Sequence, residues 1–155
     1  MEEGGIIMMA EGEDAEMFVY VGGDQVVPSD VVRVRIDKSV TIIPEGAFEF
    51  RRSLIDVEFH NGIEIIEEGA FNCCYSLRGS IKLLGIKVIK MKAFHMCYGL
   101  AELEFGDKLE TIEAGAFQFC TSLRTVTMPC ARSIGRWAFS NCRHLTDLDL
   151  PEGLE

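Results

Sequence analysis

One unit of the chain reads Leu109-Glu-Thr-Ile-Glu-Ala-Gly-Ala-Phe-Gln-Phe-Cys-Thr-Ser-Leu-Arg-Thr-Val-Thr-Met-Pro129. Its pattern of an isoleucine, an Ala-Phe pair, usually a cysteine and a leucine occurs five times along the sequence. The phenylalanines lie 23, 23, 23 and 22 residues apart, at Phe48, Phe71, Phe94, Phe117 and Phe139. A fixed period of this length is typical of solenoids, in which each unit buries its apolar face only against its neighbours. The sequence therefore predicts a repeat solenoid.

Two kinds of apolar spacing alternate within each unit. From Ile112 the apolar residues follow at steps of three to five as far as Leu123, which favours one or two turns of helix. Val126 and Met128 then alternate with threonines, which is the period of a strand with one buried side. We expect one such strand per unit, stacked in parallel, with the inward-facing pairs Val34/Ile36, Val57/Phe59, Ile81/Leu83, Leu103/Phe105, Val126/Met128 and Leu148/Leu150. Gly79 adds one residue to the third of these strands.

These units resemble the BspA-type leucine-rich repeat, a class of roughly 23 residues per repeat. The resemblance covers residues 31–155, as five repeats and an incomplete sixth. It implies an α/β repeat solenoid, a right-handed superhelix with a parallel concave β-sheet and short helical or irregular segments on the convex side. Characterised relatives are similar in being binding or adhesion proteins without catalysis, and the resemblance therefore implies a protein that is not an enzyme.

The segments outside the repeats have separate expected roles. Residues 1–16 are acidic and without periodicity, and we expect a disordered leader. Residues 17–30 read as an N-terminal hairpin cap, in which a strand at 17–21 turns at Gly22-Gly23-Asp24 and returns through 25–27. The sequence stops about six residues before the next Ala-Phe pair would fall, so we expect this chain to be part of a longer array.

Acidic residues are concentrated near the N-terminus. Residues 1–31 carry eight acids and no Lys or Arg, whereas residues 32–155 carry 17 acids against 15 bases, and together they give the net charge of −10. Without a basic face, nucleic acid is not an expected partner. The sequence has neither a signal-peptide pattern nor an apolar run of the ~18 residues of a membrane span. We expect a cytoplasmic or otherwise intracellular protein, or a surface protein if the chain is truncated.

The cysteines and histidines do not form a pattern typical of a catalytic or metal site. Four cysteines occupy one position of successive units and should form a linear column inside the solenoid: Cys74, Cys97, Cys120 and Cys142. A tetrahedral metal site needs ligands that converge on one point, so we interpret this column as packed thiols and expect no metal. Cys73 and Cys130 lie off the column and are the better candidates for reactive thiols. The three histidines occur at three different phases of the repeat, which argues against a catalytic constellation.

The outward-facing residues of the strands form the candidate binding surface. They give one row of Arg35, Glu58, Lys82, Glu104, Thr127 and Asp149 and a flanking row of Arg33, Asp56, Ser80, Glu102, Thr125 and Asp147. Neighbours in a parallel sheet lie ~5 Å apart, so Arg35–Glu58–Lys82–Glu104 should alternate in sign along the stack. This ladder is either a purely structural set of salt bridges or a docking strip for a partner. Trp137 stands where other units have glycine, either packed on the convex side or in contact with a partner.

The function that these observations favour is a non-catalytic protein–protein interaction module, which binds through the concave strand face and needs no cofactor. Extracellular adhesion or ligand recognition is one alternative. A structural role as one segment of a longer repeat array is another. The change of the strip from basic at Arg33 and Arg35 to acidic at Asp147 and Asp149 would also suit head-to-tail self-association.

Overall fold

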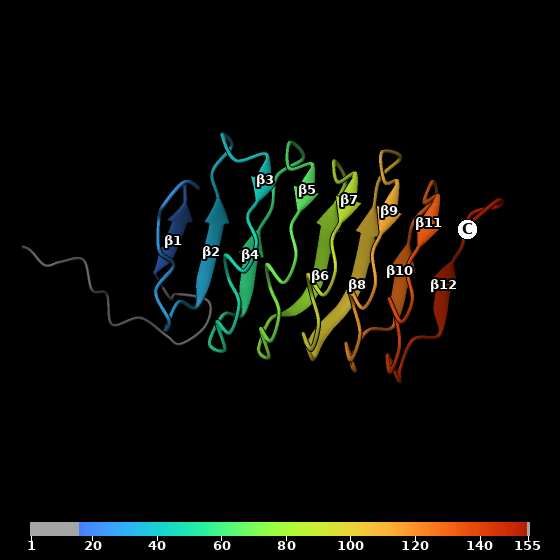
Figure 1. Ribbon diagram of the computed structural model, residues 1–155. Helices are drawn as coiled ribbons and strands as arrows, with labels where there is room; N and C mark the ends of the chain where they lie inside the picture. The colour runs from blue at the N-terminus through green and yellow to red at the C-terminus, as the bar shows by residue number, and fades with distance from the viewer. Residues whose placement is uncertain (1–15, 155) are drawn as a thin grey trace, which may run out of the picture.

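The computed structural model describes residues 16–154, which form a parallel-strand solenoid (Figure 1). The long-strand side of the coils carries a three-stranded sheet, β1 (Met17–Tyr20), β2 (Arg33–Ile36) and β4 (Asp56–Glu58), and a four-stranded sheet, β6 (Arg78–Leu83), β8 (Gly99–Phe105), β10 (Thr125–Thr127) and β12 (Asp147–Asp149). The second side carries a five-stranded sheet of two-residue strands: β3 (Ile42–Ile43), β5 (Ile65–Ile66), β7 (Val88–Ile89), β9 (Thr111–Ile112) and β11 (Ser133–Ile134). The predicted acidic leader lies outside the described residues, apart from Glu16.

The repeat period fixes the register of both sides. On the long strands, Val34 pairs with Val57 and Leu103 with Val126, as the alternation in the sequence predicts. On the second side, the isoleucine of each unit pairs with the isoleucine of the next, from Ile43↔Ile66 onward. Gly79 produces the expected irregularity, because the register of β6 shifts between Gly79 and Ser80. Its φ of 86° is one that glycine adopts easily and other residues rarely do.

The predicted helical turn between the isoleucine and the leucine of each unit is wrong, since residues 16–154 contain no helix. Alternate backbone N–H groups of this segment bond to the next coil, as the Phe48 N–H does to the Ala70 carbonyl at 2.7 Å. Those between them close tight turns within their own coil, as the Glu49 N–H does to the Gly46 carbonyl at 3.1 Å. Left-handed residues such as Gly46 (φ 61°) and Phe50 (φ 62°) also interrupt any helical run. The segment is instead a series of tight turns. Within the described range, accordingly, no helix is present that could cross a membrane.

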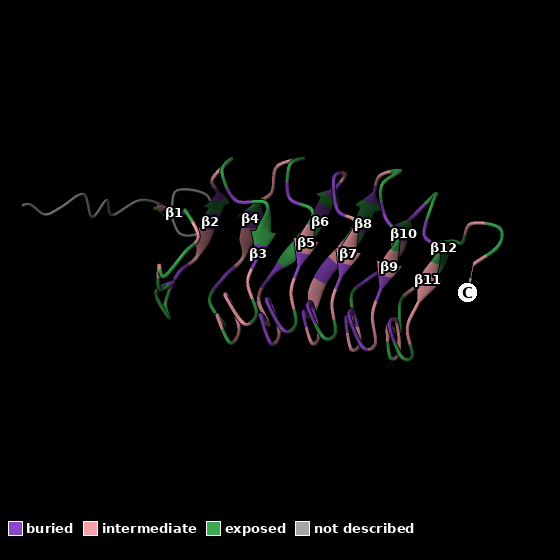
Figure 2. Ribbon diagram, turned by 45° about the horizontal axis from the view of Figure 1, so that its top comes forward, coloured by how far each residue is buried: buried purple, intermediate pink, exposed green. Residues whose placement is uncertain are grey.

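The core is built from columns of identical residues. Figure 2 shows in purple where the buried residues lie along the coils. The rings of Phe48, Phe71, Phe94 and Phe117 are fully buried and stack with centroids 4.8, 5.0 and 5.2 Å apart and interplanar angles of at most 5°. Phe139 continues the column at 5.4 Å but is only partly buried. Because each ring stacks on the rings of the adjacent coils, the column connects the coils into one core.

The second column consists of the packed thiols that the sequence predicts. Each Sγ donates to the carbonyl of the phenylalanine one coil earlier, from Cys74 to Phe48 at 3.1 Å and from Cys97 to Phe71 at 3.2 Å, and likewise for Cys120 and Cys142. Burial raises the pKa of Cys74 to about 12 and that of Cys142 to about 11. The column is therefore uncharged near neutral pH. Each thiol is a second donor to a phenylalanine carbonyl that already accepts a backbone N–H, as the Phe48 carbonyl does from Arg51 at 3.2 Å.

The predicted hairpin cap is also wrong, although its first strand is present. β1 pairs in parallel with β2, with Met17 opposite Arg33, and residues 25–27 form no strand. Only 16 residues separate these partners, so the first coil is too short to reach the second side of the solenoid. The Tyr20 ring instead packs edge-on against Phe48, with centroids 5.0 Å apart, and covers that end of the phenylalanine column. A shortened coil, rather than a returning strand, protects the start of the core.

Arg51 stands where the later coils have the column cysteine, and the structure explains the exchange. Its guanidinium donates to the Val27 carbonyl at 2.7 and 3.1 Å and to the Glu49 carbonyl at 2.9 Å. The Val27 carbonyl, in the shortened first coil, thus takes the place of the phenylalanine carbonyl to which the thiols of the later coils donate. Arg51 therefore attaches the cap to the first full repeat.

The last coil is less buried than the others. Leu148 and Leu150, which correspond to the buried Val126 and Met128 of the preceding coil, expose 36% and 49% of their surface. Leu145 is likewise only partly buried. The apolar columns are thus covered at Tyr20 and open to solvent at the last described coil.

Replacing Phe94 by alanine should lower the free energy of unfolding by about 3–5 kcal/mol, because it opens a cavity in the middle of the column. Phe139→Ala provides a matched control with a smaller expected loss, since this ring is only partly buried. Urea unfolding of both variants measures the difference. An equal loss at the two positions would contradict the central role of the column.

The thiol column predicts a loss of stability at high pH. Below about pH 9 the thiols are protonated in both the folded and the unfolded chain; above it, the unfolded chain ionises first because burial raises the folded pKa of Cys74 to about 12. The free energy of unfolding should therefore fall as pH rises from 9 toward 12, by up to about 1.4 kcal/mol per pH unit for each such thiol. Urea unfolding under reducing conditions should show a shallower fall for Cys74→Ala. The same slope in both proteins would rule out this account.

Candidate functional site

The predicted binding residues lie together on the long-strand side, and we call this surface the strand face. Parallel pairing places Arg33 beside Asp56, Arg35 beside Glu58, Lys82 beside Glu104, Glu102 beside Thr125, and Thr127 beside Asp149. Arg33 and Asp56 are half-buried, and the other residues of the predicted site are exposed: Arg35, Glu58, Lys82, Glu102, Glu104, Thr127, Asp147 and Asp149. The alternation of the strands therefore turns one set of side chains to solvent while the other fills the core.

The charges of the strand face pair within two separate groups. Arg33 bonds to Asp56 at 3.1 Å and Arg35 to Glu58 at 2.9 Å, whereas the Lys82 ammonium lies 3.7 Å from Glu104. The predicted ladder does not run continuously through all four charges, because β4 and β6 belong to different sheets. Among residues 16–154 no ion pair joins Glu58 to Lys82, since Glu58 pairs with Arg35 and Lys82 with Glu104.

The strand face becomes acidic toward the last coil. Ser80 donates a hydrogen bond to Glu102, and a shallow hollow of about 240 Å³ lies across β6, β8 and β10. Asp147 and Asp149 follow on β12, and no described Lys or Arg lies within ion-pair distance of either carboxylate. The first half of the face is therefore neutralised by its own arginines, and the second half presents unpaired negative charge.

The remaining candidate groups do not assemble into a catalytic site. His60, His95 and His144 each bond to a different partner: the Asp37 carbonyl, the Asn72 side chain and the Thr121 carbonyl. Of the two thiols predicted to be reactive, Cys130 is exposed and Cys73 is buried, with its Sγ 4.0 Å from the Met96 sulfur. In the part of the chain that the structure describes, no three His, Cys, Asp or Glu side chains are grouped to hold a metal ion.

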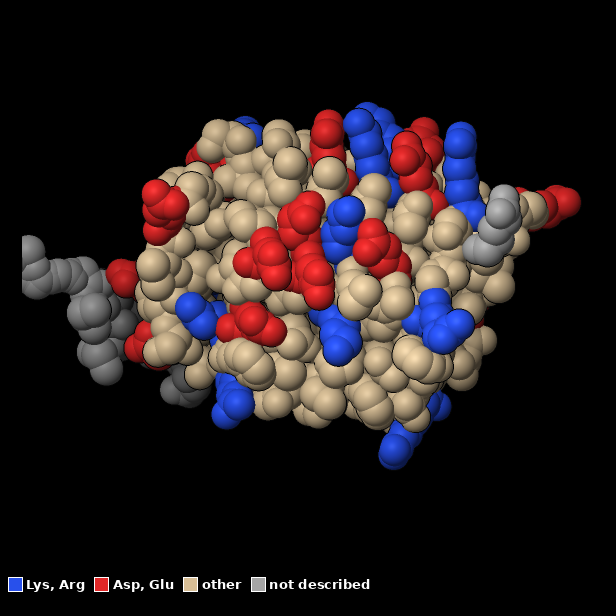
Figure 3. Space-filling model, viewed as in Figure 1, with Lys and Arg blue, Asp and Glu red and all other residues tan. Residues whose placement is uncertain are grey.

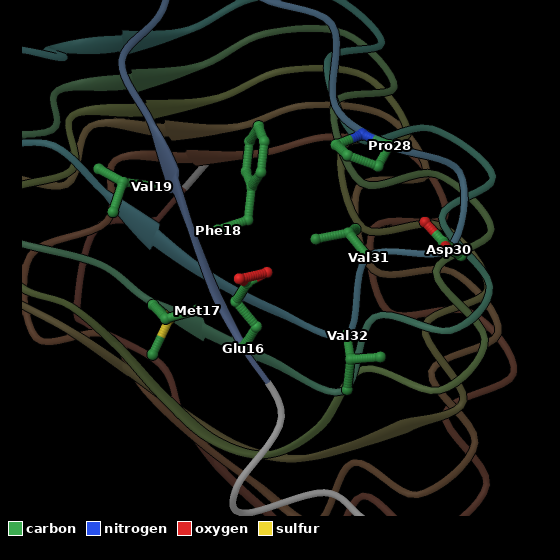
Figure 4. Close-up of a pocket in the computed structure, with 8 residues that line it drawn as sticks. All are labelled: Glu16, Met17, Phe18, Val19, Pro28, Asp30, Val31 and Val32. Atoms are coloured by element: carbon green, nitrogen blue, oxygen red, sulfur yellow. The ribbon is translucent and has the colours of Figure 1, made fainter. Parts of the chain in front are cut away.

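A cavity of about 360 Å³ lies at the first coil, between β1 and the segment that ends at Val32 (Figure 4). Phe18 and Val31 contribute apolar side chains, and Glu16 and Asp30 contribute two carboxylates. The cavity contains neither a nucleophile nor a general base beside one. It is a gap in the packing of the shortened coil and has no arrangement suited to chemistry.

A second surface, which surrounds Trp137, is only weakly indicated by the sequence. A hollow of about 640 Å³ is lined by Met91, Lys92, His95, Ala114, Gly115, Gln118, Arg136 and Trp137. Lys92 and Trp137 stand where the other units have glycine, and this departure from the repeat is the feature of the sequence that indicates the second surface. Figure 3, which looks onto the side of the five-stranded sheet, shows acidic side chains gathered near the middle and basic side chains around them. We call the hollow lined by these eight residues the Trp137 hollow.

Comparisons with solved structures agree with the solenoid. A leucine-rich repeat protein of T. pallidum is 26% identical with a TM-score of 0.76, over 90% of this chain and 66% of that one. A leucine-rich repeat protein from Bacteroides ovatus is 23% identical with a TM-score of 0.55, over 80% of this chain and 38% of that one. The pneumococcal vaccine antigen PcpA is 16% identical with a TM-score of 0.51, over 81% and 41% of the two chains. This chain thus spans between about one third and two thirds of the length of these proteins.

A search of curated protein sequences finds no match. The family described as "BspA type Leucine rich repeat region" matches residues 29–146 in six copies. This range covers most of the chain and includes every Ala-Phe unit described above. The chain therefore belongs to the BspA-type leucine-rich repeat family.

Proposed function

We propose that this chain is a non-catalytic protein-recognition module that binds a protein partner through the strand face. The observation that carries the proposal is the fixed lateral spacing of polar side chains on successive parallel strands. Neighbouring side chains in such a sheet lie ~5 Å apart, which gives a partner a rigid set of contact points and so a low entropic cost of binding. Membership of a repeat family typical of recognition proteins supports the same function.

The charge distribution specifies the chemistry of the partner. Arg33 and Arg35 already have carboxylate partners in the first half of the face, so they attract a partner weakly. Glu102, Asp147 and Asp149 have no such cation in the described chain and lie around the shallow hollow and β12. A partner segment that carries Lys or Arg residues would complete these pairs. We therefore place the contact on β8, β10 and β12.

Affinity capture from native extract tests this assignment. One variant carries Glu102→Ser, Asp147→Ser and Asp149→Ser; a matched control loses three exposed carboxylates elsewhere, through Glu45→Ser, Glu68→Ser and Glu110→Ser. Both variants change the net charge equally, and circular dichroism verifies that each is folded. A specific partner should be retained by the wild type and the control and reduced at least tenfold by the strand-face variant. Equal capture by all three proteins would show that the strand face is not the binding surface.

A further inference from the structure

The Trp137 hollow arises from one column of left-handed backbone positions. Equivalent residues of the five units have φ between 56° and 64°: Gly46, Gly69, Lys92, Gly115 and Trp137. Residues with side chains rarely adopt this conformation, although the turns of this solenoid place a second column in it, at Phe50, Cys73, Met96, Phe119 and Asn141. The two exceptions to glycine occur on either side of Gly115, in the coils before and after it. The side chains of Lys92 and Trp137 therefore form the two walls of a single hollow.

Small residues form the floor of that hollow. Gly115 lies between Lys92 and Trp137, and in the adjacent column Ala114 lies between Met91 and Arg136. One coil with minimal side chains thus separates two coils with large ones, which leaves the volume of about 640 Å³. The space is a consequence of the repeat register, since equivalent residues of successive units lie side by side.

The walls are basic and have no acidic counterpart in the lining. Lys92 and Arg136 form no ion pair with any carboxylate of residues 16–154, and the lining contains no Asp or Glu. The neighbouring Glu113 is engaged by Lys90 at 3.5 Å. The Arg136 guanidinium lies over the Trp137 ring, 5.5 Å from its centroid, which orients the cation beside an aromatic surface.

The walls are also unusually apolar for an exposed surface. Trp137 exposes 61% of its area and Met91 exposes 41%. Tryptophan, methionine and arginine are the residue types enriched at protein interfaces, and tryptophan and arginine dominate their binding energy. The hollow therefore offers two cations and a large apolar contact at one place.

We infer that the Trp137 hollow binds an acidic peptide segment that carries one large apolar side chain. The apolar side chain occupies the space over Gly115, between Trp137 and Met91, and the flanking carboxylates pair with Lys92 and Arg136. A long polyanion such as nucleic acid fits less well, because it would extend past the hollow over Glu45, Glu49 and Glu68, one to two coils away, whereas a short peptide would not. This site lies apart from the strand face and has the opposite charge preference.

Trp137 is the only tryptophan of the chain, so its fluorescence reports directly on the hollow. The probe is an acetylated and amidated octapeptide of Glu and Asp around a central Leu, compared with the peptide in which every carboxylate is an amide. The full chain should show a saturable change in Trp137 emission with the acidic peptide. Its affinity for the amide peptide should be at least tenfold lower.

Charge variants locate the contact. Lys92→Glu with Arg136→Glu should lower the affinity for the acidic peptide at least tenfold, whereas a control with the same charge change, Lys108→Glu with Arg124→Glu, should leave it within about threefold of wild type. The strand-face variant should also bind the acidic peptide normally, so failures of the two proposals are distinguishable. The inference would be overturned if the wild type bound the acidic and the amide peptide with equal affinity. It would also be overturned if the Lys92→Glu, Arg136→Glu variant bound the acidic peptide as tightly as the wild type.

Trp137→Gly provides a test that does not depend on charge. Glycine relieves the left-handed conformation, so this variant should stay folded, with a melting temperature at or above that of the wild type. Calorimetric titration should show at least tenfold weaker binding of the acidic peptide. Unchanged affinity would contradict the proposal. Analytical ultracentrifugation provides a second check. If the chain is a dimer that covers the hollow, and the peptide binds only after the two copies dissociate, the hollow is a self-association site and the proposal is wrong.

Discussion

Hydrogen bonds between successive coils are the constraint on which the rest of the structure depends. Each fully buried phenylalanine of the column donates its amide to the alanine carbonyl of the following coil, as Phe94 does to Ala116 at 2.8 Å. These bonds use the groups that an α-helix would bond internally, so the segment is a series of turns. They also hold equivalent residues of adjacent units side by side. An inserted residue must then be absorbed locally, as the bulge at Gly79 absorbs it.

The columns that result have different consequences inside and outside the solenoid. Inside, phenylalanine repeats at one position and gives a continuous stack of rings, while the cysteine thiols donate to carbonyls along the same axis. Outside, no packing requirement selects identical residues, so each column carries a sequence of different side chains. The strand face changes from paired charges to unpaired carboxylates along its rows, and the Trp137 hollow results from small residues between large ones. The two proposed binding surfaces therefore depend on the residues that vary along a column.

The sequence predicts what the period controls and misses what depends on local backbone geometry. The spacing of Phe48 to Phe139 and the alternation around Val126 were sufficient for the core column and the strand positions, and Gly79 was visible as an extra residue in the third strand. The helical turn was wrong because apolar steps of three to five also describe a chain of tight turns. The hairpin was wrong because Gly22-Gly23 indicates a turn without indicating where the chain goes next. The two-residue strands of the five-stranded sheet are too short to show any period. Trp137 was visible as a departure from glycine, but its neighbours Met91 and Arg136 became apparent only once the coils were stacked.

Native-state hydrogen exchange tests the inter-coil bonds most directly. The amides of Phe71, Phe94 and Phe117 donate to the following coil, whereas the described part of the chain supplies no acceptor for the amide of Phe139. The account predicts that the first three amides exchange slowly, near the rate set by global unfolding, and that the Phe139 amide exchanges orders of magnitude faster. Equal protection of Phe94 and Phe139 would mean that local bonds within each unit, rather than bonds between coils, hold the repeat together, and it would contradict the account.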